Sequence, residues 1–259
     1  DDEGFLRIAH ETGRTRDLVD RLLDLGRVDE AAAEIRRADD STLFEMVGLL
    51  MAKTHADLAA RLVRERLPAA RDSTRFMEWL KERASERGDA AEALQFSEAL
   101  FWKLPTLSRY DEVRQFARAR GSWDALRPEL LARLGKANNF ALLTEIHLQD
   151  SEIDQALKTL PKATGWASYD ATPLHIRVAH AAEERYPSEA IRIYTAAAQQ
   201  LIKHQGRDNY ATAASYLARV RDLHRRLGEP NTWQALIADI RTQNKRLRAL
   251  HEELAKAGL

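Results

Sequence analysis

One motif recurs along the chain at intervals of about thirty residues: a short break, one or two acidic residues, then a small residue beside apolar ones. The small residue is an alanine in each copy, at Ala31, Ala60, Ala93, Ala125, Ala156 and Ala190. Successive alanines are 29, 33, 32, 31 and 34 residues apart. A repeat of this length is typical of stacked helical hairpins, in which each pair of helices buries its apolar face against its neighbours.

Alanine suits this position because it lets the two helices of a hairpin approach closely, while larger neighbours fill the gaps between hairpins. Apolar residues spaced three and four apart continue from end to end, and no alternating strand pattern stands out. The sequence therefore predicts an all-α protein, an α-solenoid of about seven helical hairpins. The tryptophan, glycine and proline of the tetratricopeptide consensus do not recur, so we describe the units as tetratricopeptide-like or clathrin-repeat-like.

Glycines mark the predicted ends of helical segments, because glycine tolerates the left-handed conformation that ends many helices. These are Gly13, Gly26, Gly88, Gly121, Gly135, Gly206 and Gly228.

The repeat changes character where the stretch LPKATGWASYDATP fits no helical stripe. We expect an N-terminal hairpin stack in residues 1–160, an irregular joint at 161–172 and a C-terminal stack in 173–259. The last segments are long for globular helices, which predicts capping helices over 187–205, 208–227 and 231–256.

Composition excludes several kinds of site and compartment. The chain has no cysteine, which rules out disulfides, thiolate catalysis and cysteine-bound zinc. No apolar run is long enough to span a membrane, and no signal peptide is visible, so we expect a cytoplasmic protein. The chain begins without methionine inside an acidic, helical pattern, and we interpret it as part of a longer protein.

The 40 basic and 40 acidic residues balance in number but are unevenly spread. Residues 1–60 hold 8 Lys or Arg against 14 Asp or Glu, whereas residues 203–248 hold 10 against 4. In GRDNYATAASYLARVRDLHRRL, residues 206–227, a helical wheel places the tyrosines and alanines in one apolar arc and three arginines outside it. Together with three cations of the next segment, these arginines predict a basic ridge that binds nucleic acid or an acidic partner. The six residues are Arg219, Arg225, Arg226, Arg241, Lys245 and Arg248.

Patterns that carry catalysis or metal binding are missing. His175 and His180 are five residues apart, unlike the same-face spacing of four in zinc proteases. Acidic pairs such as Asp39–Asp40 diverge on a helix, and no glycine-rich phosphate loop or nucleophile elbow occurs. We therefore predict a protein that is not an enzyme and has no cofactor and no metal.

Of five tryptophans, only Trp166 falls in the irregular joint, which makes it a candidate aromatic for a partner groove.

Residues 185–254 contain YPSEAIRIY, GRDNYATAASYL, VRDLHRRLG, and Trp233 followed by IADIRTQNKRLRAL. Through these words the chain resembles the C-terminal helical region of bacterial SWIM zinc-finger proteins. The resemblance implies an accessory module of a larger cytoplasmic protein, in a family sometimes associated with Snf-type helicases. The family's finger uses a Cys-x-Cys and a Cys-x-His pair, which this cysteine-free chain lacks, so no zinc ligand carries over.

The predicted function is a non-catalytic helical-repeat scaffold for protein–protein interaction. We expect a protein partner, with a helicase-associated complex as one setting, and neither a membrane nor a small-molecule substrate. The alternative is a nucleic-acid-binding accessory domain that uses the basic ridge.

Overall fold

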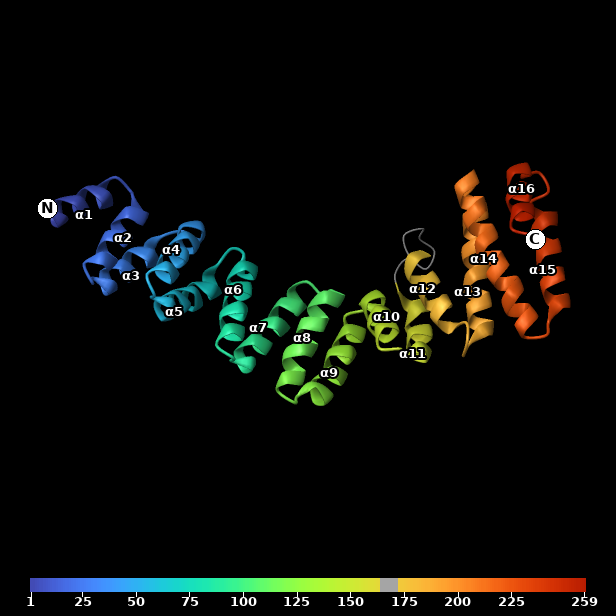
Figure 1. Cartoon of the computed structure of the whole chain (residues 1–259), viewed down its shortest axis with the longest axis horizontal. Helices are drawn as coiled ribbons and strands as arrows, with labels where there is room; N and C mark the ends of the chain where they lie inside the picture. The colour runs from blue at the N-terminus through green and yellow to red at the C-terminus, as the bar shows by residue number, and fades with distance from the viewer. Residues whose placement is uncertain (164–171) are drawn as a thin grey trace. The chain divides into compact units, whose positions relative to one another are not determined.

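The computed structural model describes residues 1–163 and 172–259. Every regular element in these residues is helical, which confirms the all-α prediction (Figure 1). The helices up to residue 136 are α1 (Asp2–Glu11), α2 (Thr15–Asp24), α3 (Val28–Arg37), α4 (Asp40–Ala52), α5 (Ala56–Arg66), η1 (Leu67–Ala69), α6 (Ser73–Glu86), α7 (Ala90–Lys103), α8 (Leu107–Ala119) and α9 (Trp123–Lys136). The others are α10 (Phe140–Gln149), α11 (Ile153–Thr159), η2 (Leu160–Lys162), α12 (Thr172–Ala182), α13 (Pro187–His204), α14 (Arg207–Arg226), α15 (Pro230–Gln243) and α16 (Arg248–Lys256).

The chain divides into two compact units, Asp1–Arg127 and Pro128–Leu259. The division falls inside α9. The predicted joint at 161–172 belongs to the second unit, and most of it lies outside the described residues. The three-part division predicted from the sequence therefore remains a prediction.

Consecutive helices pack in pairs within each unit, as the repeat predicts. In the N-terminal unit α2 packs on α3, α4 on α5 and α6 on α7; in the C-terminal unit α10 packs on α11 and α12 on α13. Equivalent helices of successive pairs also touch, such as α2 with α4 and α3 with α5. The arrangement is a series of helical hairpins, each supported by its neighbours.

The alanines of the repeat occupy the tightest positions, with one exception. Ala31, Ala93, Ala156 and Ala190 are completely buried, and Ala60 is 2% exposed. The prediction is wrong at Ala125, which is exposed. Trp123, the first residue of α9, is itself buried and sets the phase of that helix. A residue two positions later lies about 200° around the helix from it and faces solvent.

A single turn geometry joins most helices. The chain passes through one residue with positive φ, and the next amide donates a hydrogen bond to a carbonyl five residues back, as from Arg27 to Leu22 (2.8 Å). This closes the last helical turn. All the predicted glycines take positive φ except Gly135, where the prediction is wrong because α9 continues to Lys136 and Asn138 takes that conformation (φ 55°).

Ion pairs join neighbouring hairpins at the spacing of the repeat itself. Arg16 reaches Glu45 (Nη1 to Oε1, 2.9 Å), and Arg36 reaches Glu65 (Nε to Oε2, 2.8 Å), in both cases 29 residues away. Further pairs are Arg64 with Glu92, Lys81 with Glu112, Glu78 with Arg109 and Glu145 with Arg177, at separations of 28, 31, 31 and 32 residues. The exposed pairs among them each contribute little to stability, whereas the pairs of Lys81 and Arg109 are partly buried.

The C-terminal helices form a bundle. α13 and α14 are long helices, as predicted from the sequence for 187–205 and 208–227. The third predicted segment, 231–256, is wrong as a single helix, because it breaks into α15 and α16. The break follows Asn244, whose side chain donates to the carbonyl of Ile240 (2.8 Å). Asparagine side chains compete in this way with the backbone amides of a helix and favour its end.

Candidate functional site

Two arginines of the predicted basic ridge are tied to the turn between α12 and α13. The carboxylate of Glu183 accepts hydrogen bonds from Arg219 Nη1 and from the Tyr194 hydroxyl, both at 2.7 Å. Arg226 donates to the backbone carbonyl of the same glutamate. Burial, together with the hydrogen bond to Glu183, raises the pKa of Tyr194 well above its usual range. The tyrosine therefore stays a neutral donor, and the arrangement fastens α14 to α12 and α13.

The other predicted ridge residues lie apart from this contact. Arg225 is 74% exposed on the last turn of α14, near Asp222 on the same helix (4.0 Å). Arg241 donates to the backbone oxygen of Leu259, while Lys245 and Arg248 are exposed around the turn from α15 to α16. α15 runs back along α14, so this turn lies toward the start of α14, away from its last two turns (Figure 1).

The six cations thus lie in two places: Arg219, Arg225 and Arg226 on the last two turns of α14, and Arg241, Lys245 and Arg248 around the turn from α15 to α16. Two further exposed cations, Lys203 and Arg246, accompany the group at the α15–α16 turn. Wheel analysis of single helices missed them because both lie at helix ends, where no stripe exists. Trp166, the candidate aromatic for a partner groove, lies outside the described residues.

A groove of about 450 Å³ lies beside the other end of the bundle, where α13 and α15 begin and α14 ends. Its lining is mainly aliphatic or small: Ile191, Arg192, Thr195, Ala196 and Gln199 of α13, His224 of α14, and Thr232 and Leu236 of α15. His224 is 5% exposed, and its Nδ1 lies 3.1 Å from Oε2 of Glu229, the residue that precedes α15. The groove can therefore accept apolar side chains between two helices that run in the same direction.

A larger hollow of about 540 Å³ lies beside α1 and α2 and is lined mainly by carboxylates. The lining residues are Asp1, Asp2, Phe5, Asp17, Asp20, Arg21 and Asp24. Four of these carboxylates are already paired within the chain: Asp2 with Arg21, Asp17 with Arg14, and both Asp20 and Asp24 with Lys53. This acidic surface is therefore largely neutralised by its own neighbours.

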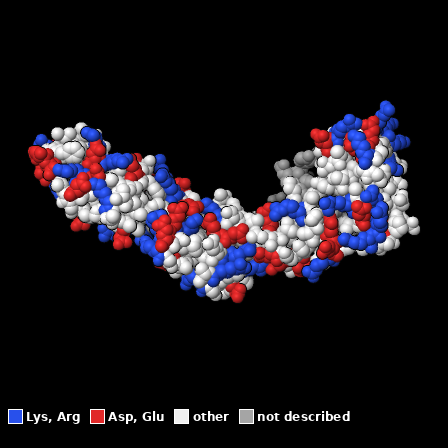
Figure 2. Space-filling view, viewed as in Figure 1, with Lys and Arg blue, Asp and Glu red and all other residues white. Residues whose placement is uncertain are grey.

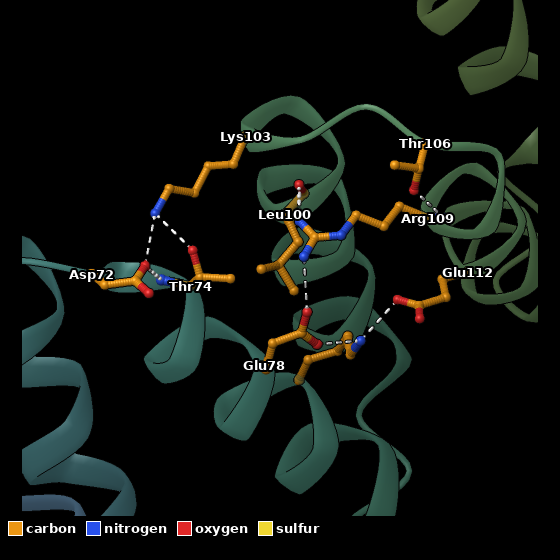
Figure 3. A network of polar contacts seen from close by, with 9 residues as sticks. Asp72, Thr74, Glu78, Leu100, Lys103, Thr106, Arg109 and Glu112 are labelled. Atoms are coloured by element: carbon orange, nitrogen blue, oxygen red, sulfur yellow. Dashed lines mark hydrogen bonds and ion pairs between the residues drawn. The ribbon is translucent and has the colours of Figure 1, made fainter. Parts of the chain in front are cut away.

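A partly buried charged cluster lies between α6 and α8 and includes contacts from α7 (Figure 3). Lys81 is 12% exposed and lies between Glu78 (2.7 Å) and Glu112 (2.8 Å). Arg109 donates to the Glu78 carboxylate (3.3 Å) and to the carbonyl of Leu100 (2.5 Å). A catalytic lysine needs a lowered pKa. Burial alone would lower the pKa of Lys81, but the bonds to Glu112 and Glu78 outweigh it and raise the pKa.

The raised pKa of Lys81 has a consequence for stability in alkali. The pKa of Lys81 in the folded state lies above 10.5, its value in the unfolded chain. The contribution of protonated Lys81 to the unfolding free energy is therefore complete below pH 10.5 and is lost as the pH rises through the folded-state pKa. The difference in unfolding free energy between the wild type and Lys81→Met should therefore stay constant up to about pH 10 and shrink as the pH rises above 10.5, measured by urea unfolding at each pH. In a Glu112→Gln background the same difference should depend less on pH. A difference that does not shrink above pH 10.5 would contradict the assignment.

Within residues 1–163 and 172–259, no three His, Asp or Glu side chains are grouped so that they could hold a metal ion. In the same residues, no helix combines the length and the apolar character needed to cross a membrane. No protein-family model matches the chain, and no curated protein matches it.

Proposed function

We propose that the protein is a non-catalytic scaffold that binds a segment of another protein in the groove between α13 and α15. The observation that carries the proposal is the groove itself, about 450 Å³ with Ile191, Ala196 and Leu236 in its lining. On the α13 side the lining residues recur at spacings of three and four, so they present a continuous stripe. Ile191 and Ala196 of this stripe, with Leu236 across the groove, offer contacts to the apolar face of an amphipathic helix.

Two charged clusters among the described residues are held in ion pairs, which favours a binding function. The partly buried lysine between α6 and α8 is held protonated by two carboxylates, and the carboxylates beside α2 are paired with cations. Neither cluster offers a free base or nucleophile of the kind that acid–base or covalent catalysis uses. The resemblance to the helical region of SWIM zinc-finger proteins gives the proposal its setting, a cytoplasmic accessory module of a larger protein.

The test selects helical peptides from a displayed random library on the purified chain, then measures the affinity of an enriched peptide by fluorescence anisotropy. Leu236→Lys should weaken binding at least tenfold, because it places a charge in the apolar lining. Leu227→Lys makes the same change at a leucine that is 38% exposed and outside the groove lining, and it should leave the affinity unchanged. Circular dichroism confirms that both variants are folded. Equal loss in both variants, or no enriched peptide, would refute the proposal.

A further inference from the structure

Four cations at one end of the C-terminal bundle have no acidic partner among the residues that the structure describes. They are Lys203, Lys245, Arg246 and Arg248, all exposed. Elsewhere in the chain many arginines and lysines are paired, often across hairpins, as Arg36 is with Glu65. We refer to these four residues as the basic end.

The chain's path brings the four residues to the same end of the bundle. α13 and α14 are joined by a two-residue turn and run antiparallel, so the end of α13, with Lys203, lies beside the start of α14. α16 lies there as well, because Arg207, the first residue of α14, pairs with Glu252 (Nη2 to Oε2, 2.5 Å). Lys245, Arg246 and Arg248 follow one another in the turn that leads into α16. Figure 2 shows basic side chains at this end of the C-terminal helices.

The acidic residues nearby do not cancel this charge. Glu252 and Glu253 are held by Arg207, and Glu253 also by Lys256 (2.7 Å). Two acidic residues remain at this end of the bundle: Asp208 in the first turn of α14, and Asp239 near the end of α15, which accepts a hydrogen bond from Gln243 (2.7 Å). The basic end therefore keeps an excess of positive charge that can attract a polyanion.

The surroundings of the basic end favour a phosphate backbone over a protein surface. Protein interfaces have an apolar centre, but the exposed large hydrophobic residues of the described chain all lie elsewhere: Phe5, Ile8, Leu25, Leu104 and Leu227. Stacking on unpaired bases needs exposed aromatic rings. The two tyrosines of α14 do not supply them, since Tyr210 is 5% exposed and Tyr216 packs against Tyr194 (5.8 Å between ring centroids).

We propose that the basic end binds the phosphate backbone of a nucleic-acid duplex through charge, without contacts to bases. The inference is independent of the proposed groove, which lies at the opposite end of α13. It also replaces part of the predicted ridge, because Arg219 and Arg226 are occupied by Glu183. Binding of this kind releases counterions and weakens steeply with salt. For four phosphate contacts, the affinity for duplex DNA should fall roughly a hundredfold between 50 and 200 mM salt.

The experiment measures fluorescence anisotropy of labelled duplex DNA, duplex RNA, single-stranded DNA and a polyglutamate peptide with the full chain. The test variant replaces the four residues of the basic end by glutamine. The control variant makes the same change at four exposed cations elsewhere in the same unit: Lys136, Lys158, Lys162 and Arg185.

The test variant should lose at least tenfold in affinity for duplex at 50 mM salt and show a shallower salt dependence, while the control variant loses less than threefold. The DNA and RNA arms show which duplex is preferred, and either preference supports the proposal. Absence of duplex binding by the wild type at 50 mM salt, equal losses in the two variants, or tighter binding of polyglutamate than of duplex would overturn it. The groove peptide should bind the test variant as it binds the wild type, which separates this result from the test of the proposed function.

Discussion

Replacing Leu100 by alanine should lower the free energy of unfolding of the N-terminal unit by about 2–5 kcal/mol, because the change leaves a cavity in a packed core. Leu100 is completely buried in α7, and its neighbour Phe101 is buried against Tyr110 of α8. The same replacement at Leu104 should change stability by no more than about 0.5 kcal/mol. Leu104 stands one helical turn later, at the end of α7, and is 59% exposed.

The two leucine variants carry the same substitution at a buried position inside α7 and at an exposed position just after it. Urea unfolding followed by circular dichroism gives the two differences in free energy. The hydrogen bond from Arg109 Nη1 to the backbone carbonyl of Leu100 remains available in the variant, so the expected loss measures packing alone. Similar effects at the two positions would show that the packing of α7 against α6 and α8 is not as described.

Ala190→Leu should destabilise the C-terminal unit by about 1–3 kcal/mol, because a larger side chain must force its neighbours apart. Ala190 is completely buried in the first turns of α13, within the core that also holds Ala182 and Tyr194. It is the last alanine of the repeat, and the one whose helix also lines the groove. The variant should therefore weaken the groove's binding of a selected peptide as well as the fold.

Ala125→Leu is the control for Ala190→Leu, because it makes the same change at another alanine of the repeat that is exposed. It should change the unfolding free energy by no more than about 0.5 kcal/mol. Thermal and urea unfolding of both variants provide the comparison. Destabilisation by more than about 1 kcal/mol at Ala125 would mean that the repeat places this alanine in the core after all.

The sequence predicts the helical hairpins well because the repeat length and the alanine positions both reflect packing between helices that follow one another in the chain. Five of the six alanines of the repeat are buried. Ala125 was misassigned because the position of a motif does not define where its helix begins, and a large aromatic residue starts that helix. The break after Asn244 was missed for a similar reason: the apolar stripe continues on both sides of it.

The candidate sites were harder to predict than the fold. Glu183 is 36 residues from Arg219, so a helical wheel of α14 gives no sign that this arginine has a partner. Lys203 and Arg246 come together with Lys245 only through the path of three helices. Wheels place a charge around one helix, whereas a charged surface depends on which helix ends meet. The groove between α13 and α15 depends on such a meeting as well.

The ion pairs between hairpins have a consequence for how such a chain can change in length. Arg36 pairs with Glu65 and Arg64 with Glu92, so each pair connects positions that are about one repeat apart. Inserting or deleting a few residues inside a helix would shift an apolar face and these charges together. Duplicating or removing one whole hairpin would leave each remaining residue with an equivalent neighbour. The fold can therefore be lengthened or shortened in steps of one hairpin at little cost to its packing.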